Sequence, residues 1–309
     1  MAIGAVSLCM VSAGCGRDDT QSAPPAPAVD VAAHKAEVER WRAERDARLR
    51  RPDGWLTLIA LAWLREGENP FGSDPHGVVV LPEGKAPARA GTFVVAGGKV
   101  EVRVEPGVAL TAAGEEIEVK ELQTDAQGEP TMLQLGSLTL YVIERRGRLA
   151  ARVKDGESPL LASFPGMEYW PIDPAHRVVA RFEPKPPGAT IEVPNIMGGV
   201  DAEAAPGTAV FTLAGRELRL DPIIERGSDE LFFIFGDETN GEETYGGGRF
   251  LYAAMPDAQG RVVLDFNQAY NPPCVFTDYA TCPLPPPGND LPVAVEAGEM
   301  AYHGPGGHA

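Results

Sequence analysis

The residues best suited to chemistry follow a predicted strand near residue 265. Seven consecutive positions supply a carboxylate, two carboxamides and a phenol, on Asp265, Asn267, Tyr270 and Asn271. Such groups can orient a polar ligand by hydrogen bonds, and the prolines that follow restrict the freedom of the loop. Asn and Asp in loops also cap turns by bonding backbone amides. The segment therefore predicts a ligand-binding loop, with turn capping as the structural alternative.

Cys274 and Cys282 lie in the same loop, eight positions apart. In an exported protein two nearby cysteines most often form a disulfide, which would stabilise this short loop by about 2–3 kcal/mol. A metal-binding pair and a nucleophilic Cys274 stay open as alternatives. His176 and His303 are far from both cysteines in sequence, so we expect no metal ion and no cofactor.

A second cluster lies at the start of a strand, where Tyr245 and three glycines precede Arg249. Nucleotide-binding glycine loops precede a helix, so a bulge or a close backbone approach explains these glycines better. Arg249 can pair with Asp265 or Glu243, or it can bind an anion. We include Tyr245 and Arg249 in the predicted ligand-binding set.

His176 is the one histidine that we consider as a general base. It would need Asp173 or Asp265 beside it to orient the imidazole. A lone histidine at this place, directly before a strand, is also typical of a cap or of a satisfied core residue. The candidate catalytic residues of a hydrolase-type enzyme are therefore Asp265, His176 and Cys274.

The elements that must position these residues are mostly strands. The 35 Gly and 29 Pro favour short strands and turns. Between residues 71 and 155 the turns recur roughly every 8–12 residues, as in a β-sandwich. Two alternating runs, 249–255 and 261–266, flank a turn and predict a hairpin. We expect a mainly β protein in which a sandwich-like subdomain packs with a second antiparallel subdomain.

Helix formers and Glu/Arg pairs predict a surface helix over residues 33–50, anchored by Trp41. The apolar run Trp55–Leu64 fits either a helix or a buried strand. The predicted division of the chain is a signal segment at 1–14, a tether at 15–34, a helix plus sandwich at 35–158, a β subdomain at 159–303 and a disordered tail at 304–309.

Two resemblances extend this interpretation. The strings PDGWLTLIALAWLREGENP at 52–70, ETYGGGRFLY at 243–252 and DFNQAYNPPC at 265–274 resemble the bacterial and archaeal family catalogued as domain of unknown function 1684. That resemblance implies no activity and no catalytic residue. The strands between residues 71 and 155 resemble a forkhead-associated sandwich, and Ser73 and His76 do not reproduce its phosphothreonine-reading loop. We transfer only the architecture.

The N-terminus and the net charge bear on location and partners. The uncharged run before Cys15 resembles a lipoprotein signal, which would place a lipid on Cys15 and the protein in the bacterial cell envelope, at the periplasmic face of the outer membrane. An ordinary signal peptide, or a mis-assigned start on a cytoplasmic protein, is the alternative. A formal charge of −17 repels phosphate backbones and argues against nucleic-acid binding.

Three functional classes remain at this point. The first is an envelope lipoprotein that binds a small polar ligand or a partner through the loop after Asp265. The second is a hydrolase-type enzyme that uses Asp265, His176 or Cys274. The third is a phosphopeptide-type interaction module. The sequence does not predict the oligomeric state.

Overall fold

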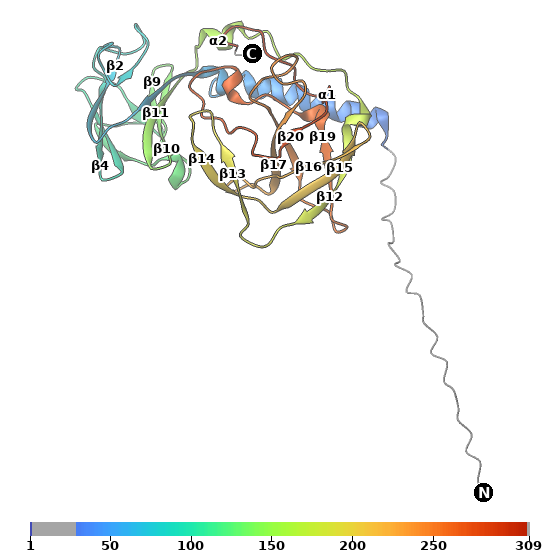
Figure 1. The fold of residues 1–309 in the computed structure, drawn as a ribbon. Coiled ribbons are helices and arrows are strands. Elements are labelled where there is room, and N and C mark those ends of the chain that lie inside the picture. The colour runs from blue at the N-terminus through green and yellow to red at the C-terminus, as the bar shows by residue number, and fades with distance from the viewer. Residues whose placement is uncertain (2–28, 308–309) are drawn as a thin grey trace.

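The computed structural model describes Met1 and residues 29–307, and the described chain is mainly β, as the sequence predicts. The signal segment, Cys15 and most of the tether lie outside the described residues, as do the last two residues of the predicted tail. Figure 1 shows a smaller β unit, residues 58–155, beside a larger one, residues 159–303. We refer to these as the N-terminal unit and the C-terminal unit.

The N-terminal unit is a sandwich of two sheets. The strands of the first, in spatial order, are β1 Leu58–Trp63, β11 Arg148–Asp155, β10 Leu138–Arg145, β9 Leu133–Leu135, β6 Thr111–Ala112 and β7 Glu115–Glu116. Those of the second are β3 Val79–Val80, β2 Gly67–Gly72, β4 Gly91–Ala96, β5 Lys99–Val104 and β8 Val119–Leu122. Phe71 and Phe93 share one core with Leu140 and Val153. Alternate residues of both sheets bury their side chains between the layers, which confirms the predicted sandwich.

The C-terminal unit also has two main layers. One sheet contains β16 Arg216–Leu220, β15 Gly207–Leu213, β12 Arg177–Pro184 and β19 Arg261–Asp265. The other contains β18 Arg249–Ala254, β17 Glu230–Asp237 and β20 Asp290–Leu291. A separate ribbon pairs β13 Thr190–Pro194 with β14 Val200–Ala204. Phe211 and Leu218 of the first layer share a core with Phe233 and Leu251 of the second.

The predicted hairpin between β18 and β19 is wrong. β18 pairs with β17, and β19 pairs with β12, so the two runs belong to different sheets. The turn between them carries the chain from one layer to the other. Leu251 and Leu264 are buried in the same core from opposite layers. An alternating pattern reports that one face is buried, and it does not identify the neighbouring strand.

Helix α1, Val31–Leu49, begins where the Asp30 side chain accepts hydrogen bonds from the amides of Ala32 and Ala33. Its buried residues include His34 and Arg45, and both contact carboxylates of the C-terminal unit. Figure 1 shows the helix running along that unit, although the sequence analysis grouped it with the sandwich. Polar anchors of this kind leave no apolar stripe in the sequence.

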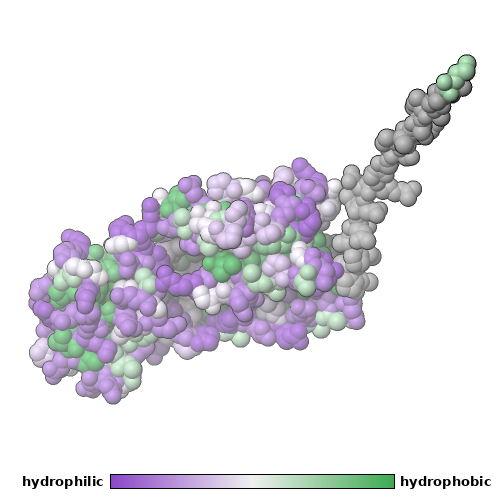
Figure 2. Space-filling view, turned by 90° about the horizontal axis from the view of Figure 1, so that it is seen from below, coloured by the Kyte–Doolittle hydropathy of each residue, from purple (hydrophilic) through white to green (hydrophobic). Residues whose placement is uncertain are grey.

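Short helices connect the layers. The run Trp55–Leu64, which the sequence left open, forms a 3₁₀ turn followed by β1. The other short helices are η2 Asp125–Gln127, α2 Pro159–Ser163, η3 Pro174–His176, η4 Phe266–Gln268 and η5 Pro273–Val275. A further core packs Leu49 of α1 and Leu56 against Phe276 and the loop cysteines. In the view of Figure 2 the surface is mostly hydrophilic, with scattered hydrophobic patches.

Candidate functional site

A cavity of about 330 Å³ lies where the two units meet. Arg145 and Arg152 line it from the N-terminal unit, and Trp55 lines it from the turn before β1. The main contributors from the C-terminal unit are Glu225, Phe232, Phe250, Tyr252, Tyr270 and Thr281. This volume is at the lower end of the roughly 300–1,000 Å³ of small-molecule pockets. The cavity combines aromatic walls with charged groups, so we take it as the candidate site.

Arg152 is the least satisfied charge in this cavity. Its side chain leaves β11, is buried, and donates from Nη2 to Oγ1 of Thr281 at 3.0 Å. Nε has no hydrogen-bond partner, and the guanidinium lies 5.5 Å from the ring centroid of Trp55. Within residues 29–307 it forms no ion pair with a carboxylate. Burial lowers the pKa of Arg152, yet an arginine remains charged near neutral pH.

The other two arginines of the cavity have carboxylate partners. Nη1 of Arg145 lies 2.6 Å from Oδ2 of Asp125, and Nε of Arg45 lies 2.9 Å from Oε1 of Glu299. The positive charge of Arg145 contributes to the lowered pKa of Arg152, after the larger effect of burial. Of the three arginines that line the cavity, Arg152 is therefore the one that has no carboxylate partner in the described chain.

Two tyrosines form the opposite wall. The rings of Tyr252 and Tyr270 stack with centroids 6.2 Å apart, and the guanidinium of Arg45 lies 4.6 Å from the centroid of Tyr270. The hydroxyl of Tyr252 donates to Oε2 of Glu225 at 2.5 Å. Burial raises the pKa of both phenols, so they remain neutral donors at physiological pH. The wall therefore offers flat apolar surface with hydroxyl groups at its edge.

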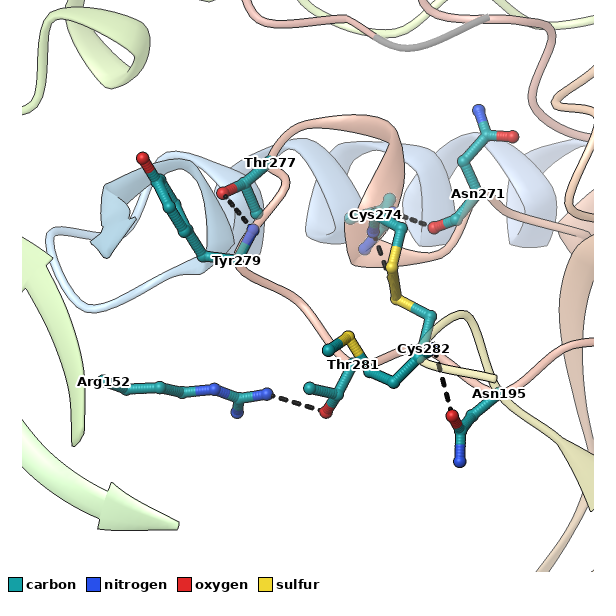
Figure 3. The surroundings of a disulfide bond; sticks show 10 residues. Arg152, Asn195, Asn271, Cys274, Thr277, Tyr279, Thr281 and Cys282 are labelled. Carbon is teal, nitrogen blue, oxygen red and sulfur yellow. Dashed lines mark hydrogen bonds between the residues drawn. A yellow bond between two sulfur atoms is a disulfide. The ribbon is translucent and has the colours of Figure 1, made fainter. Parts of the chain in front are cut away.

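The disulfide between Cys274 and Cys282 is confirmed, with 6.2 Å between the two Cα atoms. Figure 3 shows how it ties η5 to the segment of Thr281, toward which Arg152 extends. The cross-link thus fixes one wall of the cavity. Cys274 carries no free thiolate when it is bonded in this way, which contradicts its proposed role as a nucleophile.

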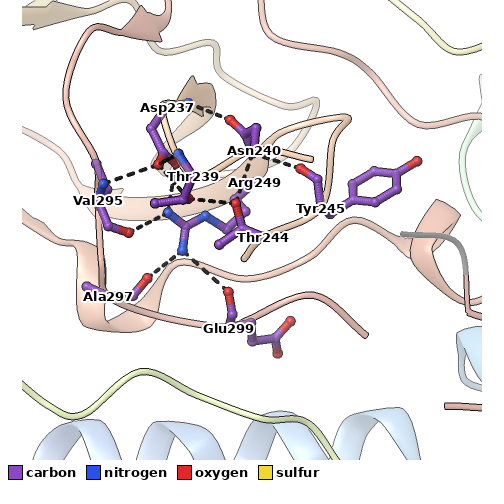
Figure 4. A network of polar contacts seen from close by, with 9 residues as sticks. All are labelled: Asp237, Thr239, Asn240, Thr244, Tyr245, Arg249, Val295, Ala297 and Glu299. Atoms are coloured by element: carbon purple, nitrogen blue, oxygen red, sulfur yellow. Dashed lines mark hydrogen bonds and ion pairs between the residues drawn. The ribbon is translucent and has the colours of Figure 1, made fainter. Parts of the chain in front are cut away.

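Arg249 holds the C-terminal segment of the chain. It is fully buried, and Nη2 lies 2.8 Å from Oδ2 of Asp237 and 2.8 Å from the carbonyl oxygen of Val295. Nη1 donates to the carbonyl of Ala297 (Figure 4). The predicted partners, Asp265 and Glu243, were wrong, because β18 lies beside β17, at whose end Asp237 stands.

Tyr245 lies near this network without joining it through its ring. Its carbonyl oxygen accepts a hydrogen bond from Asn240 at 2.7 Å. Figure 4 shows the ring directed away from Arg249, and the side chain packs in the core beneath the disulfide loop. Neither Tyr245 nor Arg249 lines the cavity between the units.

Asp265 pairs with a histidine that the sequence analysis did not consider. Nε2 of His34 lies 2.7 Å from Oδ2 of Asp265, and Oδ1 accepts from Nδ2 of Asn267 at 2.8 Å. Asn267 also bonds the backbone N–H and carbonyl of Asp173. Nδ1 of His176 lies 3.8 Å from Oδ2 of Asp173. Asp265 and His176 are thus linked indirectly, through Asn267 and Asp173, while Arg249 belongs to a different network. None of the three lines the cavity between the units.

Asn271 serves a buried structural network. Its backbone N–H donates to Oε2 of Glu299 at 2.7 Å, and its side-chain Nδ2 donates to the carbonyl oxygen of Met300 at 2.7 Å. Gly298 positions Glu299, because a Cβ there would approach the carbonyl oxygen of Ala269 to 2.4 Å, and its φ of +81° favours glycine. Among the six predicted ligand-binding residues, Tyr270 lines the cavity.

Sequence reasoning missed Arg152, Glu225 and Tyr252 as site residues, and it considered Trp55 as the start of an apolar run. One signal was present for Arg152. It is a charged residue within the run LAARV, inside a strand whose neighbours are buried. Charges in such positions need a partner, so an arginine there points to a salt bridge or a ligand. For Glu225 we find no comparable signal.

A protein-family model described as "Protein of unknown function (DUF1684)" matches residues 162–300. An uncharacterised protein of Haloarcula marismortui, whose solution structure is known, is 34% identical over 44% of this chain and 77% of its own, with a TM-score of 0.37. The chain belongs to the DUF1684 family. The family match covers the C-terminal unit, while the motif at 52–70 precedes the matched range.

Two forkhead-associated structures are also similar to this family member. The domain of FhaA, solved with the intracellular domain of a partner, is 15% identical over 30% of this chain and 96% of its own, with a TM-score of 0.22. A domain from work on phosphothreonine-dependent interactions is 16% identical over 32% and 96%, with a TM-score of 0.22. No protein with a curated description matches the chain.

Two further features concern metals and membranes. Across residues 29–307, no three His, Cys, Asp or Glu side chains gather in a way that could hold a metal ion. Of the helices in the same part of the chain, none has the length and apolar character that crossing a membrane requires.

Proposed function

We propose that this member of the DUF1684 family binds a small organic anion in the cavity between its two units. The observation that carries the proposal is the buried guanidinium of Arg152, which interacts with the hydroxyl groups of Thr281 and Tyr141 and forms no ion pair with a carboxylate in the described chain. A buried charge without a counter-ion costs free energy, and an anionic ligand would remove that cost. Arginine also suits this role because its planar fork can bind a carboxylate or phosphate by two hydrogen bonds.

The rest of the cavity favours an anion with a flat apolar body. Trp55, Phe232 and Tyr252 supply aromatic surface, and such rings stack on planar groups. The loop after Asp265 contributes Tyr270 and Thr281, so the proposed site includes part of the loop that the sequence indicated. The hydrolase alternative gains no support, because neither Asp265 nor His176 lines this cavity, and Asp265 is bonded to His34 and Asn267.

Isothermal calorimetry with benzoate, 3-phenylpropionate and phenyl phosphate tests the proposal, after a thermal-shift screen of the same compounds. We expect Arg152→Met to weaken binding about tenfold or more, since a hydrogen bond to a charged group contributes about 1.5–3 kcal/mol. Arg148→Met is the matched control, because Arg148 is an exposed arginine of the same strand whose guanidinium lies over Trp63. Anion binding that is equal in both variants, or absent in the wild type, contradicts the proposal.

For location, we propose export and lipid attachment at Cys15. The disulfide supports export, because such bonds persist in oxidising compartments and are rare in the cytosol. A lipid at Cys15 would tether the folded units to the envelope, at the periplasmic face of the outer membrane. Mass spectrometry of the N-terminal peptide from membrane fractions tests this, and an unmodified chain that begins at Met1 contradicts it.

A further inference from the structure

The candidate cavity carries opposite charges from opposite units. Arg152 enters it from β11 of the N-terminal unit, and Glu225 lines it from the C-terminal unit. The carboxylate of Glu225 accepts a hydrogen bond from the hydroxyl group of Tyr252, and no cation of the described chain forms an ion pair with it. An ionised carboxylate has about four acceptor positions, so Glu225 can accept further donors.

Arg152 and Glu225 do not satisfy each other. Arg152 is buried and directed at Thr281, whereas Glu225 is exposed and bonded to Tyr252. Aromatic groups lie along the C-terminal wall beside Glu225, with Phe232 and Tyr252 stacked at 4.7 Å between centroids. The faces of these rings attract an ammonium group as well as an apolar body.

We propose that the ligand is a zwitterion of the amino-acid or short-peptide class. Its carboxylate binds Arg152, its ammonium group binds Glu225 beside Tyr252, and its side chain packs on the aromatic wall. A ligand of this kind contacts both units at once. The cavity volume of about 330 Å³ suits a molecule of that small size. The inference rests on the proposed anion site at Arg152 and adds the second recognition point.

Calorimetry at pH 7 with matched ligands tests the role of the ammonium group. In the first pair, phenylalanine is compared with 3-phenylpropionate. In the second, alanyl-phenylalanine is compared with its N-acetyl form. Phenethylamine serves as the cation without a carboxylate. We expect at least one zwitterion to bind about tenfold or more tightly than its partner without the ammonium charge. We expect phenethylamine to bind more weakly than that zwitterion.

The variant Glu225→Gln locates the effect. It should reduce the zwitterion's affinity to that of the matched anion and leave the anion's affinity unchanged. Glu217→Gln, an exposed residue of β16 outside the cavity, is the control and should change neither affinity. Because Glu225 is exposed, the variant is expected to fold, and an unchanged melting temperature checks this.

The outcomes separate this inference from the proposed function. If anions bind through Arg152 while both zwitterions bind no better than their partners, the zwitterion inference is overturned and the anion site stands. If the advantage of a zwitterion persists in Glu225→Gln, the assignment of the ammonium group to Glu225 is overturned. If no ligand of the set binds, both proposals are overturned.

Discussion

Two buried arginines in this protein have opposite surroundings. Arg249 pairs with Asp237 and donates to backbone carbonyls of the C-terminal segment, so the chain itself neutralises its charge. Arg152 has neutral partners, which are the hydroxyls of Thr281 and Tyr141 and the ring face of Trp55. Burial is similar at the two positions, and the difference lies in the partners. The comparison teaches that the partners of a buried charge, more than its burial, distinguish a structural role from a ligand-binding one.

The largest expected effect comes from replacing Arg249, the arginine that has a carboxylate partner. Arg249→Met leaves Asp237 buried with an unpaired charge and removes the donors that hold three carbonyl groups. We expect the free energy of unfolding to fall by about 3–5 kcal/mol, as measured by chemical denaturation.

The control for that prediction is Arg261→Met. Arg261 forms an ion pair of 2.9 Å with Asp257 in a turn at the surface, where such pairs contribute less than about 1 kcal/mol. If both variants lost the same free energy of unfolding, the Arg249 network would contribute no more to stability than a surface ion pair.

The next effect concerns the cross-link beside the cavity. Replacing both Cys274 and Cys282 with Ser should lower the free energy of unfolding by about 2–3 kcal/mol, because the unfolded chain gains conformational freedom. Hydrogen exchange should increase in the loop that carries Thr281 more than in β17. Faster exchange in β17 alone would contradict a local role for the disulfide. In the wild type, both cysteines should resist alkylation under denaturing, non-reducing conditions, because neither has a free thiol.

A third prediction concerns alkaline pH. Burial raises the pKa of Tyr252 and Tyr270 above the ordinary 10.0, so the unfolded chain loses these protons at a lower pH than the folded chain. The stabilisation is fully present below pH 10 and declines as the pH rises further, by about 1.4 kcal/mol per pH unit for each phenol. Tyr270→Phe should make the decline shallower in denaturation curves taken between pH 9 and 11. An unchanged slope rules out Tyr270 as a contributor.

The smallest effect on stability is expected at the unsatisfied arginine. Arg152→Met removes a buried charge that has no carboxylate partner, and methionine fills a similar volume. We expect the free energy of unfolding to change by less than about 1 kcal/mol, or to rise, while anion binding weakens about tenfold or more. A loss as large as that of Arg249→Met would remove the contrast between the two arginines.

The local elements and their chemistry could be predicted from the order of the residues. Alternating runs gave most strands close to their observed bounds, helix formers gave α1, and the spacing of Cys274 and Cys282 allowed the disulfide. The motif strings were enough to indicate the family. These features depend on residues close together in the chain, where periodicity and turn chemistry act.

Contacts between residues that are distant in the chain could not be predicted and depend on how the layers pack. Asp265 pairs with His34, 231 positions away, and Arg152 reaches Thr281 across 129 positions. The sheet to which β18 belongs, and hence the partner of Arg249, also followed from long-range pairing. A side-chain pattern specifies that one face of a strand is buried. Which residues cover that face depends on how the whole layers pack. The cavity, with an arginine that has no carboxylate partner in the described chain, arises where two units meet, so no local segment encodes it.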